Sequence, residues 1–285
     1  MPVFDYTAYQ ARMAAPPTTP VLFDRAMLRT RQARALRLGA ENFLLQRVSN
    51  ELMERLAVVR RYFANAIDLD TPSEGLREAL QSKVAGIRTV SIGDDDSAPL
   101  DFAPASADLA VSALGLQFVN DLPGVLTQLR LGLKPDGLLL AAILGGDTLT
   151  ELRQAFAAAE SEIEGGVSPR VAPMIDLRDA GALLQRAGFA LPVCDVERIV
   201  VRYDDAFALM RDLRRMGATN ILVERRRTLT HRATLLRMAQ VYAERFTDPD
   251  ARIRATFEVI WLSGWAPHES QPKPLSPNLA RAIRR

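Results

Sequence analysis

Residues 107–144 hold two apolar segments of strand length on either side of one capped helix, and few folds accommodate that pattern. The first segment, residues 107–114, reads ADLAVSAL, and the second, residues 138–144, reads LLLAAIL. Neither alternates with polar residues, which is typical of strands buried on both faces of a sheet. Asn120 or Asp121 can cap the helix between them. The segment therefore predicts a β-α-β crossover in a parallel α/β sheet.

The turn LKPDG follows this helix and determines where it stops. Pro135 cannot lie inside a helix, and Gly137 tolerates a positive φ. Residues 134–137 are therefore expected to end the helix and to begin the next buried strand.

Two amphipathic helices are predicted ahead of the sheet. Asp24 is suited to cap the first helix, whose apolar face ends near Gly39. The second helix carries an apolar stripe at a spacing of three and four residues, formed by Leu44, Val48, Leu52, Leu56 and Val59. Residues 14–20, AAPPTTP, cannot form a helix and are expected to run as an extended arm. We assign residues 1–60 to the arm and these helices.

The second half of the chain predicts a helical insertion between two late strands of the same sheet. The expected order is a helix at 176–187, a strand at 198–203, helices within 205–250 and a strand at 255–265. The last strand needs the earlier sheet to cover it, so we expect one domain over residues 61–265. Residues 266–285 are Pro-rich and form a tail.

Composition excludes several classes of protein. No apolar run approaches the roughly 18 residues that a membrane helix needs, and the first residues lack the pattern of a signal peptide, so we expect a cytoplasmic protein. The chain has one cysteine, Cys194, and two histidines, which excludes an internal disulfide and a Cys/His zinc site. We expect no metal site and no transmembrane segment, although peripheral contact with a membrane stays compatible with the sequence.

Arginine dominates the basic residues, because only three of the 36 Lys and Arg residues are lysines. Residues 197–285 contain 17 basic and 10 acidic residues, a surplus that suits an acidic or phosphorylated partner. No aromatic residues alternate with Arg225, Arg226 and Arg227, as a base-stacking surface would require. We therefore expect a solvated helix face there and no nucleic-acid partner.

Several motifs resemble the class I S-adenosylmethionine (SAM) methyltransferase superfamily, and in particular one family within it. An acidic residue at a strand end, a helix, LKPDG and a buried strand together resemble the second half of that fold. The family consists of the methyltransferase-fold arginine hydroxylases that assemble mitochondrial complex I, with their alphaproteobacterial relatives. The matching segments are FDRAMLRTRQARAL at 23–36, VNDLP at 119–123, LGGDTLTELR at 144–153, EGGVSPRVAP at 164–173, DLRRMGATN at 212–220 and WLSGWAPHESQ at 261–271.

The resemblance implies an α/β fold with a Rossmann-like class I methyltransferase sheet, N-terminal helices and a helical insertion. It also implies a SAM site, for which the family uses a turn like DLGxxxG after the first strand. Here Asp68 is kept, Asp70 stands at the key glycine, and Gly75 is the remaining glycine. If that turn holds a positive φ, each non-glycine residue costs about 1–3 kcal/mol. We therefore expect SAM binding to be weak or lost.

The chain is also shorter than the family pattern between Asp68 and Asp108, by about one strand and one helix. We expect the sheet to be shortened at its second strand, which leaves residues 88–96 as the third strand and its acidic end. Asp94 and Asp95 then become candidates for the adenine side of the cofactor, or else belong to a solvated turn.

The remaining candidates follow later strands. Ala113 and Gly145 end the strands that border the expected cofactor pocket, and Asp147 lies just beyond Gly145 in GGDT. That GGDT stretch is otherwise a turn with an Asp-capped helix, and the charges of Glu151 and Arg153 farther along are expected in solvent. His268 and Glu269 match the HES of the family and are our acid/base candidates.

Three functions stay open at this point. The first is a SAM-dependent methyltransferase or arginine-hydroxylase-like enzyme acting on a protein subunit during complex I assembly. The second is an inactive relative, a pseudoenzyme that binds a respiratory-complex subunit through the insertion and the tail. The third is a methyltransferase for a small molecule such as an acyl-carrier-protein ester, which rests on fold analogy alone.

Overall fold

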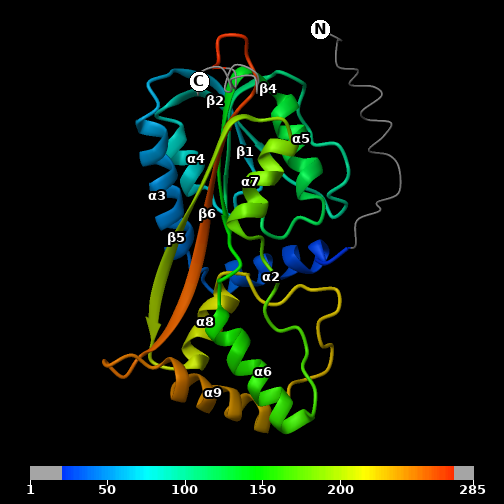
Figure 1. The fold of residues 1–285 in the computed structure, drawn as a ribbon, viewed down its shortest axis with the longest axis vertical. Coiled ribbons are helices and arrows are strands. Elements are labelled where there is room, and N and C mark those ends of the chain that lie inside the picture. The colour runs from blue at the N-terminus through cyan, green and yellow to red at the C-terminus, as the bar shows by residue number, and fades with distance from the viewer. Residues whose placement is uncertain (1–20, 273–285) are drawn as a thin grey trace, which may run out of the picture.

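A computed structural model of the chain describes residues 21–272, and it contains one mixed sheet flanked by helices (Figure 1). The strands are β1 (Phe63–Leu69), β2 (Val84–Val90), β3 (Ala107–Ala113), β4 (Leu133–Leu144), β5 (Ala190–Tyr203) and β6 (Ile253–Trp265). Their order across the sheet is β2-β1-β3-β4-β6-β5. The first four strands run parallel, whereas β6 pairs antiparallel with both β4 and β5. The predicted α/β class with a parallel crossover is confirmed.

Helices cover both faces of the sheet, because successive side chains of each strand point to opposite faces and both faces carry apolar residues. The helices α3 (Phe43–Ala57) and α4 (Gly75–Leu80) pack on one face, and α5 (Leu122–Gly132) and α7 (Leu177–Arg186) pack on the other. Along β4, Leu138 and Leu140 belong to the first core, and Leu139 belongs to the second.

The first helices follow the local signals in the sequence. α2 (Arg25–Arg37) is capped by Asp24, whose side chain accepts from the Met27 N–H, and Gly39 has φ +77° beyond its end. The apolar stripe of α3 is buried, as predicted. The extended arm expected at residues 14–20 lies outside the described residues.

The LKPDG segment differs from two expectations. α5 ends at Gly132 and β4 begins at Leu133, so residues 134–137 lie within the strand and do not end the helix. The residue with a positive φ is Asp136, at +64°, and not Gly137. Gly137 is required for another reason, because a Cβ there would lie 2.9 Å from the Lys134 carbonyl oxygen. The turn therefore needs glycine for space rather than for its backbone angle.

The sheet is short at one edge, but not where we expected the gap. β2 pairs in parallel along β1, from Phe63↔Val84 to Leu69↔Val90, so the position beside the first strand is filled. Within the described residues the sheet has six strands and ends at β2. A buried central strand needs hydrogen-bonding partners on both sides, which explains why the outer strand is the one missing.

A helical cap lies beyond the carboxyl ends of the parallel strands, and we use this name for α6 (Thr150–Glu164), α8 (Ala206–Arg215) and α9 (Arg232–Phe246). The expected insertion between the late strands supplies α8 and α9. α6 comes from the segment after β4 and packs along α9, which the sequence pattern did not indicate. Figure 1 shows the cap below the sheet, with α2 crossing between the two.

Candidate functional site

The parallel strands end together at the edge that faces the cap, and this edge is where α/β folds place their ligands. Asp70 follows β1, Gly115 lies beyond the end of β3, and Gly145 follows β4. Most of the chain's cofactor candidates are therefore gathered at one end of the sheet.

Asp70 adopts the backbone conformation for which the family uses glycine. Its φ is +53°, in the left-handed region that costs a non-glycine residue about 1 kcal/mol or more. Its backbone also lies so close to the next loop that a Cβ on Gly115 would be 2.6 Å from the Asp70 carbonyl oxygen. The turn after β1 thus combines a positive φ and a close backbone contact with a non-glycine residue.

Arg25 extends from the start of α2 into this turn. Its Nη2 donates to Asp70 Oδ2 at 2.8 Å and to the Ile92 carbonyl at 3.0 Å. Its Nε donates to the Gly93 carbonyl at 2.8 Å, and its Nη1 to the Phe118 carbonyl at 3.1 Å. Only 4% of Arg25 is exposed, so the guanidinium joins the loops after β1, β2 and β3 as a buried element of structure.

Protein side chains fill the place where the resemblance puts SAM. The space between the three loops holds the Arg25 guanidinium, and Asp70 is the carboxylate that neutralises it. The acids after β2 are engaged elsewhere, because Asp94 pairs with Arg29 and Asp95 accepts from the N–H and hydroxyl of Ser97. Asp94 and Asp95 are both exposed, and neither lines the cavity described below.

Asp68 lies two residues before Asp70, near the end of β1, and is fully buried. Its Oδ1 has no hydrogen-bond partner, and its Oδ2 is 3.4 Å from Arg77 Nη1. Burial raises the pKa of Asp68 to about 6, against the lowering effects of Thr71 and Arg77. The side chain does not line the cavity described below, so its proposed contact with a cofactor is not one that this arrangement favours.

Three small residues of the predicted site are tightly packed or remote from the cavity. Gly75 is the first residue of α4, with no backbone atom close to where a Cβ would lie. Ala113 is buried, and its N–H donates to Thr71 Oγ1 at 3.0 Å. A Cβ on Gly145 would be 2.4 Å from Glu258 Oε1, so Gly145 serves the approach of β6 to β4. None of the three lines the cavity.

Asp147 and its neighbours are held by Glu258, a residue of β6 that the sequence did not point to. Asp147 pairs with Arg198, and its N–H lies 3.4 Å from Glu258 Oε1. Thr148 Oγ1 donates to the Glu258 carbonyl at 3.1 Å, which fastens the loop to the strand. The following helix, α6, begins after Leu149 with φ +54°, and so Asp147 is not its cap.

Glu151 and Arg153 were expected in solvent, and for Glu151 that expectation is wrong, whereas Arg153 is half-buried. Glu151 is 4% exposed and accepts from the N–H and the hydroxyl of Thr256. Arg153 donates to the carbonyls of Gly146 and Thr148, and so it stabilises the same loop.

His268 and Glu269 do not belong to this end of the molecule. β6 runs antiparallel to β4, with Trp265 paired to Leu138, and Ala266 then lies beside Asp136 and Gly137 near the start of β4. The two residues that follow are exposed at the opposite end of the sheet, where His268 Nδ1 lies 2.7 Å from Ser270 Oγ. The structure therefore separates His268 and Glu269 from Asp147 and from the other candidates.

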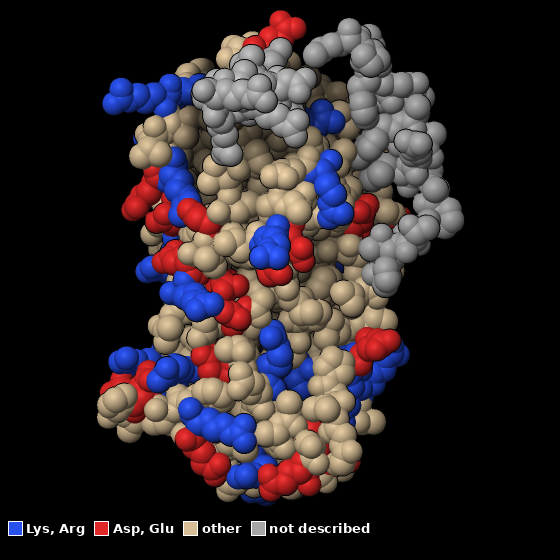
Figure 2. Space-filling view, viewed as in Figure 1, with Lys and Arg blue, Asp and Glu red and all other residues tan. Residues whose placement is uncertain are grey.

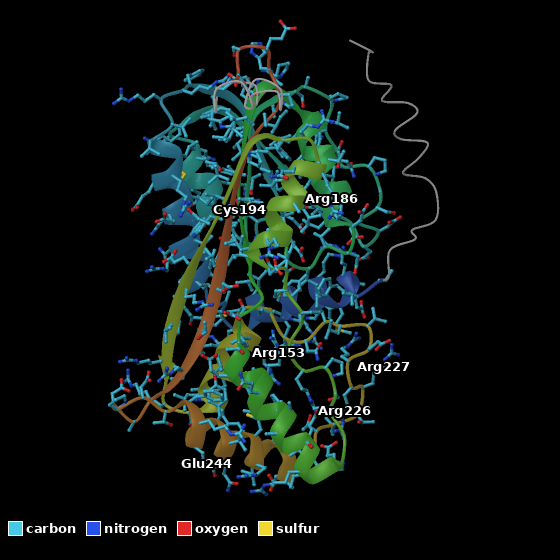
Figure 3. All side chains as sticks on the ribbon, in the orientation of Figure 1. Arg153, Arg186, Cys194, Arg226, Arg227 and Glu244 are labelled. Carbon is cyan, nitrogen blue, oxygen red and sulfur yellow. The ribbon has the colours of Figure 1, made fainter. Side chains whose placement is uncertain are left out.

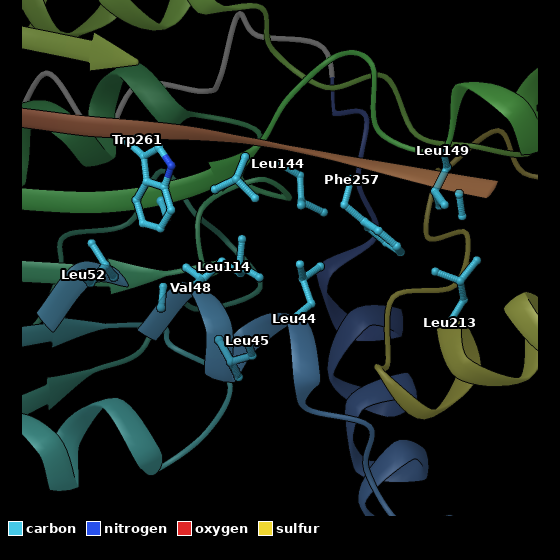
Figure 4. Packing of buried hydrophobic residues seen from close by; sticks show 14 of the residues in the cluster. Leu44, Leu45, Val48, Leu52, Leu114, Leu144, Leu149, Leu213, Phe257 and Trp261 are labelled. Carbon is cyan, nitrogen blue, oxygen red and sulfur yellow. The ribbon is translucent and has the colours of Figure 1, made fainter. Parts of the chain in front are cut away.

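A cavity of about 720 Å³ lies between the carboxyl edge, α2, α3 and the helical cap. Its floor is apolar, and Figure 4 shows part of it, where side chains of α3, β6 and α8 converge. The floor residues seen there are Leu44, Leu45, Leu114, Leu144, Leu149, Leu213 and Phe257. The volume is within the range of small-molecule sites, roughly 300–1,000 Å³.

The rim of the cavity is strongly basic. Seven arginines and only two carboxylates, Glu41 and Asp70, line it. The arginines are Arg31, Arg34, Arg170, Arg211, Arg214, Arg225 and Arg226. The basic surplus of the last third is visible in the sequence, but its location is not, because four different segments contribute arginines to one rim.

The arginines at 225–227 lie in a loop and not on a helix face, which corrects our expectation. Arg225 pairs with Asp24 and Arg226 with Glu164, whereas Arg227 is exposed. Figure 3 shows Arg226 and Arg227 on this loop, beside the cap. Figure 2 shows acidic side chains among the basic ones over the same part of this face.

Other features carry no chemistry that we can identify. Burial, followed by the charge of Asp195, raises the pKa of the Cys194 thiol, which disfavours a nucleophilic role. Across residues 21–272, no group of three or more His, Cys, Asp or Glu side chains is arranged to hold a metal ion. None of the helices in that part of the chain is long and apolar enough to cross a membrane.

Comparison with known proteins identifies the relatives of the chain. A methyltransferase-domain family model matches residues 50–141. The mitochondrial arginine-hydroxylase NDUFAF5 of Homo sapiens is 36% identical over 285 aligned residues, which cover 92% of this chain and 82% of that protein. The Danio rerio protein of the same name is 34% identical and covers 89% of this chain and 85% of its own length.

Two further similarities are more limited. A malonyl-[acyl-carrier protein] O-methyltransferase of Xylella fastidiosa (strain M23) is 42% identical over 172 residues, or 60% of this chain and 56% of that protein. The structure of a Bacillus halodurans C-125 protein described as a methyltransferase candidate matches with a TM-score of 0.51 and 12% identity, over 77% of this chain and 99% of that chain. The second similarity shows the fold alone.

Proposed function

We propose, for a chain that belongs to the arginine-hydroxylase NDUFAF5 family of methyltransferase-fold proteins, that it acts on a protein subunit during the assembly of respiratory complex I and does so without bound SAM. The first half of this proposal follows the family, since the relatives match over most of both chains. The second half follows from the site.

One observation carries the SAM-independent part, namely the pairing of Arg25 with Asp70, because Arg25 lies in a segment that matches the family whereas Asp70 stands at the family's glycine. A cofactor in the family's place would have to displace a guanidinium that donates to Asp70 and to three backbone carbonyls. Hydrogen bonds that involve a charged group are worth about 1.5–3 kcal/mol each. Displacement would also leave the Asp70 carboxylate close to the carboxylate of SAM.

Non-catalytic binding of the same subunit is the alternative form of this proposal. It is supported by the arginines of α2 and α8 that line the cavity mouth, because such charges steer association with an acidic partner. Both the catalytic and the non-catalytic form of the proposal place the subunit at the rim of the cavity, between α2 and the helical cap. Neither form uses His268 or Glu269.

A second candidate function is methyl transfer to an acyl-carrier-protein ester. The observation that favours it is the 42% identity to the Xylella fastidiosa protein over 172 residues. Methyl transfer requires SAM, whereas the proposed role in complex I assembly does not. A titration with SAM therefore distinguishes the two functions.

The test is calorimetric titration of the purified chain with SAM. We expect no saturable heat for the wild-type chain, and measurable binding for Arg25→Ala combined with Asp70→Gly, which empties the space and restores the glycine. Arg186→Ala, which removes an exposed arginine of α7 outside the cavity, is the matched control and should leave the wild-type result unchanged. A Kd in the low micromolar range for the wild-type chain would overturn the SAM-independent reading and favour the methyl-transfer candidate.

The link to complex I is tested separately, in the native host. Deletion of the coding sequence should reduce assembled NADH:quinone oxidoreductase, and the wild-type chain should restore it. Normal assembly in the deletion strain would contradict the proposed role, whatever the SAM titration shows.

A further inference from the structure

The charges at the cavity rim are only partly neutralised by the protein. Three of the seven arginines have carboxylate partners, since Arg170 pairs with Glu160, Arg225 with Asp24 and Arg226 with Glu164. The other four have no carboxylate within ion-pair distance among residues 21–272, and they are Arg31, Arg34, Arg211 and Arg214.

These four cations share one wall of the cavity. Arg31 and Arg34 project from α2, and Arg211 and Arg214 from α8, and the two helices pack against each other. Arg31 donates to Thr219 Oγ1 at 2.9 Å but to no carboxylate. Burial lowers the pKa of Arg31, and the neighbouring charges of Arg225 and Arg34 lower it further. Asp24, which pairs with Arg225, offsets part of the charge around Arg31, but among residues 21–272 no carboxylate forms an ion pair with any of the four.

The rest of the chain offers little to neutralise this wall. Glu41 also lines the cavity, but it lies 3.5 Å from Arg215, which carries a charge of its own. Asp70 is paired with Arg25. Outside the described residues the sequence contains one further acidic side chain, Asp5. The wall thus fits an anion from another molecule.

The opposite side of the cavity fits an apolar group. Leucine and phenylalanine side chains form its floor, as Figure 4 shows, and the methionines Met174, Met210 and Met216 also line it. Such a surface gains about 25 cal/mol for each Å² of apolar area removed from water. Gln117 adds one polar group, since its buried Oε1 has no hydrogen-bond donor.

We propose that this cavity binds a small amphipathic molecule, with a carboxylate or phosphate group on Arg31, Arg34, Arg211 and Arg214 and an apolar body against the leucine and phenylalanine floor. The inference goes beyond the proposed function and does not depend on it, because it rests on the charge and lining of the cavity alone. The volume of about 720 Å³ favours a small molecule over a folded partner.

The same geometry disfavours a bare arginine side chain as the occupant. A guanidinium would meet seven arginines and two carboxylates, both of which already lie beside arginines. Like charges in a partly buried site repel more strongly than in water. If a protein arginine does enter the cavity, it needs the anion beside it, which makes the amphiphile a co-ligand rather than a competitor.

The test uses four probes that share a twelve-carbon chain and differ in the head group, each below its micelle concentration. They are dodecanoate, dodecyl phosphate, dodecanol and dodecylammonium, titrated into the full chain by calorimetry. We expect at least one of the two anions to bind roughly tenfold or more tightly than dodecanol, and dodecylammonium to bind no better than dodecanol. The comparison of the two anions tells a carboxylate ligand from a phosphate ligand.

Two double variants make the test specific. Arg211→Gln with Arg214→Gln should weaken binding of the anion by roughly tenfold, since two partly exposed ion pairs are lost. Arg178→Gln with Arg186→Gln removes the same charge from exposed positions of α7, outside the cavity, and should leave binding unchanged. Figure 3 shows Arg186 on α7, on the side of the molecule away from the cap.

Three results would overturn the proposal. The first is equal binding of dodecanol and the anions, which would show that the arginines are not used. The second is an equal loss in both double variants, which would show an effect of net charge only. The third is binding of soluble poly-glutamate at this wall with no binding of either anion, which would identify a docking surface for an acidic protein instead.

Discussion

Arg25 Nη2 lies 2.8 Å from Asp70 Oδ2, so the first residue of α2 contacts the loop that follows β1. The pair links two positions 45 residues apart, and 3% of the Arg25 side chain and 22% of the Asp70 side chain are exposed. Loss of one partner of such a pair leaves a buried charge without compensation, and this is costly.

We expect Arg25→Met to lower the free energy of unfolding by about 3 kcal/mol, because Asp70 and three carbonyls lose their donor. The double variant Arg25→Met with Asp70→Gly should be more stable than the single variant, since it removes the orphaned carboxylate and the strained φ together. Urea denaturation of the three chains measures both differences. A loss below about 1 kcal/mol in the single variant would show that the pair contributes little.

Asp68 should make stability depend on pH in an unusual direction. Its pKa is raised to about 6 by burial, above the ordinary value of 3.8, so the folded state holds the proton more tightly than the unfolded state does. This group therefore favours folding below pH 4, and its contribution is lost as the pH rises from about 4 to about 6, by up to about 3 kcal/mol.

The variant Asp68→Asn cannot titrate and should remove this component. Denaturation at pH 5 and at pH 7.5, for both chains, gives the comparison. If the free energies of unfolding of the wild-type chain and of Asp68→Asn change equally between these two pH values, folding does not raise the pKa of Asp68.

Gly115 should not tolerate a side chain, because a Cβ would lie 2.6 Å from one backbone atom of Asp70 and 2.8 Å from another. We expect Gly115→Ala to cost about 1–3 kcal/mol, as overpacking of a close contact does. Gly166→Ala is the matched control, since no atom lies within 4 Å of that Cβ and its φ is not positive. Thermal unfolding of both variants checks the difference, and equal melting temperatures would contradict it.

Charge reversal at the cavity wall should impair function without unfolding the chain. Arg211→Glu with Arg214→Glu changes two exposed arginines that have no ion-pair partner among residues 21–272, and we expect association with an acidic ligand to slow by about tenfold or more. Complementation of a deletion strain, scored by assembled NADH:quinone oxidoreductase, measures the effect. Arg178→Glu with Arg186→Glu on α7 should complement normally, and equal failure of both pairs would point to net charge rather than to the wall.

Arg215 should behave differently from Arg214, although the two are neighbours in sequence. Arg215 Nε donates to the Gly39 carbonyl at 2.7 Å, and its guanidinium lies 3.5 Å from Glu41. Arg215→Ala is therefore expected to cost about 1 kcal/mol of stability, whereas Arg214→Ala should change it by less than about 0.5 kcal/mol. Chemical denaturation separates them, and the reverse order would show that Arg214 has a structural role.

The parts of the fold that the sequence predicted are those with local causes. The crossover at residues 107–144 follows from buried strand composition, an Asp121 cap and a proline turn, and all of these act within a few residues. The position of β2 was not predicted, because a short strand carries no signal for the neighbour it will pair with. Its place is fixed by the unpaired edge of β1.

The site was harder to predict, because its contacts join residues that are far apart in the sequence. The drift at Asp70 was visible in the sequence, but its partner Arg25 was not, since nothing near residue 25 indicates a contact with the turn after β1. His268 and Glu269 were placed at the site because they follow a strand, and strand direction decides which end of the sheet that is. The cavity wall needed the tertiary packing of α2 on α8.

The pairing of Tyr203 with Ile253 closes the β5–β6 ladder just where the chain departs into α8 and returns from α9. The whole excursion thus begins and ends at adjacent backbone positions, as the tip of a hairpin does. A segment attached in this way is free to be lost, lengthened or exchanged during evolution without shifting the register of any strand. Sister proteins that inherit the same sheet are therefore able to differ in what they recognise through a single hairpin tip.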